Sequence, residues 1–293
     1  PKTAWPPTSS AIIGPIIPPS NIMIIYAVCA ANVSISDMFM GGLLPGIILG
    51  LAEILLCYFI AIRCGHPYNK HRATPKEIAN ALWHSLPALG MPAIILGGII
   101  SGIFTATEAS AIAVFYALIV ATAKRQISWK SLKECCISAG KATANVMFII
   151  SIATAMSYAI TVLRIPQNIL NICLEYVHSP AMFLLLTNVV LLVLGCVLDQ
   201  SPALLMMVPI LLPVAMEFGI DPVHFGVLCC FNLTVGLITP PVGMTLFVTA
   251  NVAEVKLTEL YRKIMPFVVV GLVILCLITW CPWITTFLPS IVN

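Results

Sequence analysis

The stretch that decides the fold runs from Gly236 to Tyr261 and reads GLITPPVGMTLFVTANVAEVKLTELY. Two adjacent prolines, Pro240 and Pro241, interrupt a long apolar run. Proline has no backbone N–H and clashes with the preceding turn, so a helix cannot continue through two of them. We therefore expect a broken helix here, with the carbonyls of Gly236 and Leu237 left bare.

A second stretch, from Gly14 to Phe39, reads GPIIPPSNIMIIYAVCAANVSISDMF and follows the same pattern. It predicts a second break, with bare carbonyls at Gly14 and Pro15. At an offset of 222 residues the identical pairs are Gly14 with Gly236, Ile16 with Ile238, Pro18 with Pro240, Pro19 with Pro241, Ala31 with Ala253 and Val33 with Val255. We interpret this as an internal repeat, present as about one copy and the end of another. Because the chain begins PKTAW, without methionine or a signal-peptide pattern, we expect further sequence upstream.

Lys and Arg residues mark the cytoplasmic side of a membrane protein. They cluster in the segments 63–76, 124–141 and 256–263, whereas the segment 32–41 has none. That segment aligns with the last basic one, so equivalent positions of the two copies are predicted to lie on opposite sides of the membrane. This is the charge pattern of an inverted-topology repeat in a secondary transporter.

Composition sets the class of protein. Hydrophobic residues make up 60% of the 293 residues, charged residues 9%, and the mean hydropathy is +1.05. Spans need roughly 20 apolar residues, and helices satisfy their own backbone groups in lipid. An all-α polytopic membrane protein is therefore expected, with apolar runs at 22–62, 81–123, 142–163, 181–216, 223–253 and 264–288. The net charge of +3 does not indicate a nucleic-acid partner.

The double prolines predict sodium sites. Irregular backbone at membrane depth is tolerated where it is buried or lines a cavity, and broken helices in transporters coordinate Na⁺ and anionic substrates. Ser20, Thr239 and Thr245 add hydroxyl oxygens. The alternative is a kink that serves only packing.

Asp199 lies between two apolar arms in LLVLGCVLDQSPALLMMVPILLP. The arms are either two full spans or a re-entrant hairpin, and the charges do not distinguish them. An ionisable residue within a span is usually functional. In a hairpin, Asp199 and Ser201 would lie at the tip and meet the carbonyls near Gly236. A solvated loop is the competing interpretation.

Three other charged residues lie within or beside the apolar runs. Glu108 follows Thr105 at the start of a helix and is expected to be an N-terminal carboxylate favoured by capping. Glu53 is expected to face protein or water rather than lipid, and Arg164 is expected to snorkel to an interface.

Four motifs, taken together, resemble those of a known family. They are GPIIPPS from Gly14, GGIISGIFTATEAS from Gly97, PILLPVAMEFGIDPVHFG from Pro209 and GLITPPVG from Gly236. In this combination the chain resembles the large membrane subunit (DctM-like) of tripartite ATP-independent periplasmic (TRAP) transporters, over essentially its whole length. The residues Gln200, Ser201 and Pro202 depart from the glycine and small residues that often follow the aspartate in that family.

The resemblance implies a multi-pass, elevator-type, Na⁺-coupled importer of the bacterial inner membrane. A mobile domain of two hairpins and two broken helices would carry a small carboxylate-bearing solute, such as sialic acid, a C4-dicarboxylate or a sugar acid, past a scaffold. A periplasmic substrate-binding protein and a small membrane subunit, separate or fused upstream, would be its partners, with membrane lipid around them. No enzymatic activity and no metal other than sodium is implied.

The resemblance also assigns site residues and parts of the chain. One sodium site matches Gly14, Ile17, Pro19 and Ser20, together with a hairpin upstream of this sequence; the other matches Asp199, Ser201, Gly236, Thr239 and Pro241. Asn21, Gly243 and Thr245 are candidate substrate contacts. Residues 1–40 would end the first repeat, 41–180 would form scaffold and arm helices, 181–254 the second hairpin and broken helix, and 255–293 an amphipathic connector and final scaffold helix.

Two other function classes remain open at this stage. A sodium/divalent-anion symporter of the same fold would need no binding protein. An ion channel would use the broken helices as a filter. A membrane-embedded enzyme has no support, because no acid/base pair with suitable spacing is present in the sequence.

Overall fold

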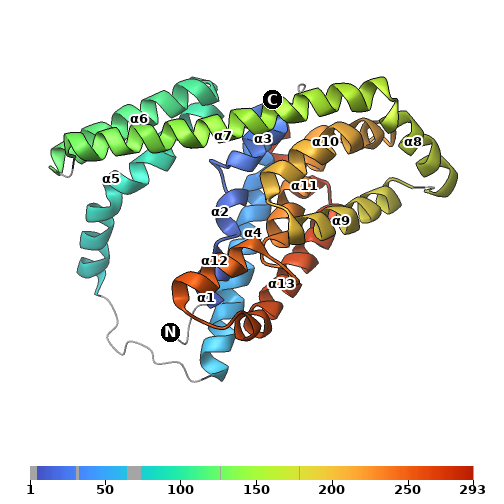
Figure 1. The fold of residues 1–293 in the computed structure, drawn as a ribbon. Coiled ribbons are helices and arrows are strands. Elements are labelled where there is room, and N and C mark those ends of the chain that lie inside the picture. Colours follow the sequence, from blue (N-terminus) through green and yellow to red (C-terminus); the bar gives the residue numbers. More distant parts are fainter. Residues whose placement is uncertain (1–4, 31–32, 65–73, 126, 178, 293) are drawn as a thin grey trace. The chain divides into compact units, whose positions relative to one another are not determined.

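The computed structural model describes residues 5–30, 33–64, 74–125, 127–177 and 179–292 (Figure 1). Every regular element in these ranges is an α-helix. The helices are α1 Trp5–Ser10, α2 Ile13–Ile16, α3 Asn21–Ala30, α4 Ile35–Arg63, α5 Pro75–Ile100, α6 Ala106–Ala123, α7 Trp129–Val162, α8 Ile165–Tyr176, α9 Pro180–Val197, α10 Gln200–Glu217, α11 Pro222–Gly236, α12 Met244–Ala253, α13 Leu257–Trp280 and α14 Trp283–Val292.

Six of these helices are long and apolar enough to cross a membrane, namely α4, α5, α7, α9, α10 and α13. A bent pair, residues 8–16 with 21–30, adds a seventh span if it is taken as one crossing. Their exposed surfaces carry large apolar side chains, as a lipid-facing surface requires. The prediction of an all-α polytopic membrane protein is confirmed.

The chain forms two compact units, Pro1–Phe59 with Ile149–Asn293 (unit 1) and Ile60–Phe148 (unit 2). In unit 2, α5 packs against α6, and the Tyr116 hydroxyl of α6 donates to Pro87 O at 2.9 Å. Both helices begin with a capping box, formed by Thr74 with Glu77 and by Thr105 with Glu108. The capping role predicted for Glu108 is thus confirmed.

Helix α11 is the centre of unit 1. Asp221 caps its first turn by accepting from the N–H groups of Val223 and His224, both at 2.9 Å. From His224 to Gly236 every residue of α11 is buried, because α2, α3, α9, α10, α13 and α14 all pack against it. A helix surrounded on all sides needs apolar residues around its whole circumference, and the sequence of α11 supplies them.

Both double prolines break a helix as predicted. The first break separates α2 from α3 and the second separates α11 from α12, and each contains a cis Pro–Pro peptide bond. The helices directly after the breaks, α3 and α12, begin at Asn21 and Met244, which is within one residue of the repeat alignment. The next helices, α4 and α13, begin at Ile35 and Leu257, which are 222 residues apart. These boundaries agree with the repeat alignment. Ala31 and the basic residues of 65–73 lie outside the described residues, and the inversion stays a prediction.

Helices α9 and α10 form the hairpin expected around Asp199. They pack against each other and are joined only by Leu198 and Asp199 (Figure 1). Each has 18 residues, which fits either two full spans or a re-entrant hairpin, so both alternatives stay open.

The predicted domain boundaries describe which parts move and remain predictions. Helix α13, predicted as scaffold, packs on α1, α9, α11 and α12 within unit 1.

Candidate ion-binding site

The hairpin tip lies against the end of α11. Gly195 of α9 and Gly236 of α11 approach so closely that a Cβ on Gly236 would lie 2.7 Å from the Cα of Gly195. Just beyond them, the N–H of Gly243 donates to Cys196 O at 3.0 Å. The structure therefore joins the last turn of α9 to both sides of the second break, and the predicted contacts of Asp199 and Ser201 with the carbonyls near Gly236 stay predictions.

A third contact comes from a residue that departs from the family pattern. The side-chain amide of Gln200 lies 3.2 Å from Thr234 Oγ1, and Thr234 Oγ1 also lies 2.6 Å from Cys230 O. The Thr234 hydroxyl is the donor in both contacts, to Cys230 O and to the amide oxygen Oε1 of Gln200, so one proton is shared between two acceptors. The tip is thereby tied to α11 by a side chain as well as by backbone.

Three of the four carbonyls expected to be bare have hydrogen-bond partners, which corrects the expectation from sequence for Pro15, Gly236 and Leu237. Gly236 O accepts from Thr239 N at 3.0 Å, Leu237 O accepts from Thr245 N at 3.3 Å, and Pro15 O accepts from Ser20 Oγ. A chain that leaves a helix turns within a few residues and brings new donors beside these acceptors. Since a carbonyl oxygen has two lone pairs, each of the three retains capacity for a cation.

Two predicted hydroxyl ligands use their protons within the break. Thr239 Oγ1 donates to Val235 O at 2.8 Å, and Ser20 Oγ donates to Pro15 O. A hydroxyl that gives its proton to a carbonyl keeps its oxygen lone pairs available to a cation. Ser20 also accepts from Met23 N at 3.4 Å, so it has the additional structural role of capping α3.

The remaining predicted residues differ in access to solvent. Asp199, Pro241, Gly14, Pro19 and Asn21 are exposed, whereas Ser201, Thr239, Thr245 and Ile17 are half-buried and Gly236, Gly243 and Ser20 are buried. The Asp199 carboxylate does not cap α10, although its residue occupies the cap position. It is thus an exposed charge at the hairpin tip.

The first break is packed against α4. Two glycines of α4 allow this approach: a Cβ on Gly42 would lie 3.1 Å from Ile16 O, and one on Gly46 would lie 2.5 Å from Ile17 Cγ1. Helix α2 also contacts α11. The structure therefore places both breaks in unit 1, with α11 of the second break in contact with α2 and α3 of the first.

Glu53 and Arg164 lie elsewhere. Glu53 is buried on α4, as predicted, and within the described part of the chain its Oε1 has no hydrogen-bond partner. Arg164 lies in the exposed turn between α7 and α8 with a left-handed backbone. Neither was found in the contacts that join the hairpin tip to the second break.

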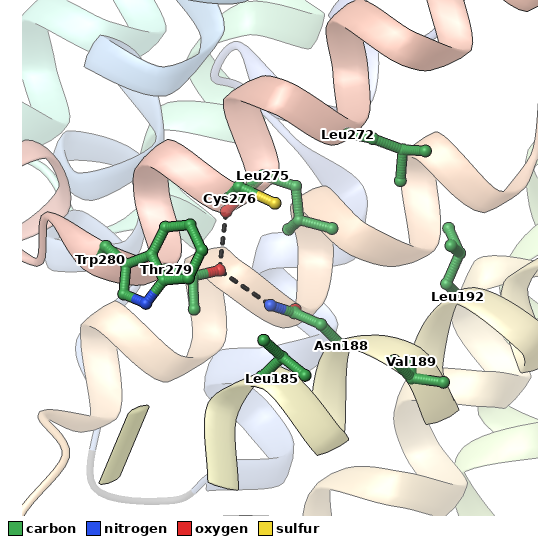
Figure 2. A pocket seen from close by; sticks show the side chains of 9 residues that line it. All are labelled: Leu185, Asn188, Val189, Leu192, Leu272, Leu275, Cys276, Thr279 and Trp280. Carbon is green, nitrogen blue, oxygen red and sulfur yellow. Dashed lines mark hydrogen bonds between the residues drawn. The ribbon is translucent and has the colours of Figure 1, made fainter. Parts of the chain in front are cut away.

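A cavity of about 170 Å³ between α9 and α13 is lined by none of the predicted site residues (Figure 2). Its polar groups bond to one another: Asn188 Nδ2 donates to Thr279 Oγ1 at 2.8 Å, and Thr279 Oγ1 donates to Leu275 O at 2.7 Å. Asn232 of α11 donates to Asn188 Oδ1 at 2.9 Å. This network cross-links three helices of unit 1 and leaves the cavity with apolar walls.

Sequence reasoning missed three contributors to the junction of tip and break, namely Gly195, Cys196 and Gln200. The signal for Gly195 was present, because a glycine, which has no Cβ, permits the close approach of another backbone. The sequence held no signal for the contacts of Cys196 and Gln200, because these contacts depend on how α9, α10 and α11 meet in space.

A helical membrane bundle in which broken helices meet the tip of a hairpin has the architecture of secondary transporters. A family model described as "Tripartite ATP-independent periplasmic transporter, DctM component" matches residues 7–284. The chain belongs to this family. It is accordingly a multi-pass protein of the bacterial inner membrane.

Several named relatives are similar over almost the whole chain. A 2,3-diketo-L-gulonate TRAP transporter large permease of Escherichia coli is 38% identical over 94% of this chain and 64% of its own length. A C4-dicarboxylate TRAP transporter large permease of Pseudomonas aeruginosa is 38% identical, over 96% and 66%. A sialic acid TRAP transporter permease of Haemophilus influenzae is 35% identical, over 97% and 46%. The chain thus spans less than two thirds of the length of these relatives.

Proposed function

We propose that the chain is part of the membrane permease of a sodium-driven importer of a small organic anion. The observation that carries this proposal is the junction of hairpin tip and second break. There the carbonyls of Gly236 and Pro241 and the hydroxyl of Thr239 are predicted to converge with the exposed carboxylate of Asp199. Carbonyl, hydroxyl and carboxylate oxygens are suitable ligands for a hard cation such as Na⁺.

The solute class is inferred from chemistry and from relatives. The named relatives transport sialic acid, C4-dicarboxylates and 2,3-diketo-L-gulonate, and one further relative is named for isethionate, which is a sulfonate. All are small organic anions. A cation bound at the break would offset part of the negative charge of such a solute, with Asn21, Gly243 and Thr245 as candidate contacts.

The proposed mechanism is an elevator in which the hairpin and the broken helices of unit 1 carry the site. Sodium would order the hairpin tip against the break, so that the loaded site can cross. Helix α13, expected to be scaffold, packs on α9 and α11, so the hairpin and the second broken helix would move along it in this mechanism. A periplasmic binding protein would deliver the solute, and a small membrane subunit, as the fused name of the isethionate permease suggests, would support the scaffold.

The transport proposal is tested by uptake in proteoliposomes that contain the assembled transporter and its binding protein. A panel of N-acetylneuraminate, succinate and 2,3-diketo-L-gulonate is offered under an inward Na⁺ gradient and under an equal K⁺ gradient. We expect concentrative uptake of at least one solute with Na⁺ only. Equal uptake under both gradients would contradict sodium coupling, and uptake without the binding protein would favour the simpler symporter.

Thr239→Val tests the hydroxyl ligand. Valine keeps the shape of threonine but removes an oxygen from the proposed sodium shell. We expect the Na⁺ concentration for half-maximal uptake to rise about tenfold, since the loss of one hydrogen-bonding or ligating group is worth about 1–1.5 kcal/mol.

The matched control is Thr249→Val. Thr249 Oγ1 donates to the carbonyl four residues earlier, Thr245 O, at 2.9 Å, which is the same bond that Thr239 makes with Val235. It lies on α12 beyond the break. If the Na⁺ concentration for half-maximal uptake rises similarly in both variants, the effect comes from losing a hydroxyl-to-backbone bond and not from losing a sodium ligand.

A further inference from the structure

The carbonyl of Pro241 is held by a residue from a different helix. Tyr261, in the second turn of α13, donates its hydroxyl to Pro241 O at 2.6 Å. Helices α12 and α13 pack against each other and are joined by Glu254, Val255 and Lys256. Tyr261 thus reaches back along α12 to the break that precedes it.

The first break is held differently. There Ser20 Oγ donates to Pro15 O. The residue that aligns with Ser20 in the second copy, 222 positions later, is Val242, which has no hydroxyl. Conversely, the residue 222 positions before Tyr261 is Phe39, which is buried and has no hydroxyl. The bonds of Ser20 to Pro15 O and of Tyr261 to Pro241 O therefore come from non-equivalent positions of the repeat. The second break has, in addition, the local bond of Thr239 to Val235 O.

We propose that Tyr261 is a positioning residue for the second sodium site, acting by fixing the direction of the Pro241 carbonyl. The inference rests on the proposed function, in which that carbonyl is a sodium ligand. The hydroxyl occupies one lone pair of Pro241 O and leaves the other to the cation. Without it, sodium would have to order the exposed Pro241 peptide group on binding, and ligand ordering lowers affinity.

This role also links the site to α13. The first bond is local, because Ser20 follows Pro15 by only five residues. The second bond spans 20 residues and depends on the packing of α12 on α13. A displacement of the start of α13 would therefore move a ligand of the second site and leave the first unchanged.

The test is saturation binding of radioactive Na⁺ to the purified, assembled permease, comparing wild type with Tyr261→Phe. We expect the Na⁺ concentration for half-saturation to rise about three- to tenfold, as loss of one hydrogen bond predicts, with the amount bound at saturation unchanged. A purely structural role would lower the amount bound through loss of folded protein and leave the half-saturation of the remainder unchanged.

Tyr58→Phe is the matched control, since it removes the same hydroxyl from an exposed ring on α4. It should leave both quantities at the wild-type value. If Tyr261→Phe binds Na⁺ as wild type does, or more tightly, the positioning role is overturned while sodium coupling stands. If wild type itself shows no saturable binding, both this inference and the proposed function are wrong.

Discussion

Gly236→Ala is expected to reduce transport by about tenfold or more, because overpacking a close contact costs about 1–3 kcal/mol and displaces neighbouring groups. The added Cβ would lie 2.7 Å from both the Cα and the carbonyl carbon of Gly195. These are backbone atoms, so no side-chain rotation relieves the contact. The hairpin tip must move away from the second break, and the proposed site opens. Uptake and thermal unfolding of the purified permease measure the effect.

Two further variants test whether the loss of transport follows the closeness of the contact. Gly195→Ala places its Cβ 3.2 Å from Leu233 O, a milder contact, and should have a smaller effect. Gly50→Ala in α4 meets nothing within 4 Å and should be neutral or slightly stabilising, because alanine favours helix. Wild-type transport by Gly236→Ala would show that the close approach of tip and break has no functional role.

Gly243→Ala is expected to have the second large effect. Gly243 has φ +60°, where an L-residue pays about 1–2 kcal/mol. Its Cβ would also lie 2.7 Å from Leu246 Cδ1 and 3.0 Å from Leu237 O. The strain falls on the residue whose N–H bonds to Cys196, so we expect that link between hairpin and break to be lost and uptake to fall about tenfold or more.

Gly219→Ala separates the cost of the left-handed backbone from the cost of the close contacts of the added Cβ. Gly219 has φ +72°, so alanine pays a similar backbone cost there, but nothing lies within 4 Å of its Cβ position. We expect modest destabilisation and nearly normal uptake. If Gly219→Ala and Gly243→Ala lose stability and uptake equally, the backbone conformation alone explains the loss and the contacts at the break are unimportant.

Much of the fold follows from sequence because the decisive features are local. Two adjacent prolines break a helix wherever they occur, so Pro240 and Pro241 predicted the second break and the matched pair Pro18 and Pro19 predicted the first. The observed starts of α4 and α13, Ile35 and Leu257, fall at positions that the repeat alignment equates. Apolar runs of span length predicted the all-α class, since lipid leaves few alternatives.

The details of the site were less predictable because they depend on contacts between helices. The partners of Gly236 O and Leu237 O are the N–H groups of Thr239, just before the two prolines, and of Thr245, in the first turn of α12. Counting lost helical donors therefore overestimated the number of bare carbonyls. The bonds of Gly243 to Cys196 and of Tyr261 to Pro241 join residues 47 and 20 positions apart. No periodicity or motif marks such pairs before the helices are packed.

The central claim is that the junction of the α9–α10 hairpin and the α11–α12 break binds sodium. Equilibrium binding of radioactive Na⁺ to the purified, assembled permease tests it most directly, without knowledge of the solute. We predict saturable binding that excess unlabelled Na⁺ displaces and excess K⁺ does not, and that Thr239→Val weakens. Absence of saturable binding, or equal displacement by K⁺, would contradict the account.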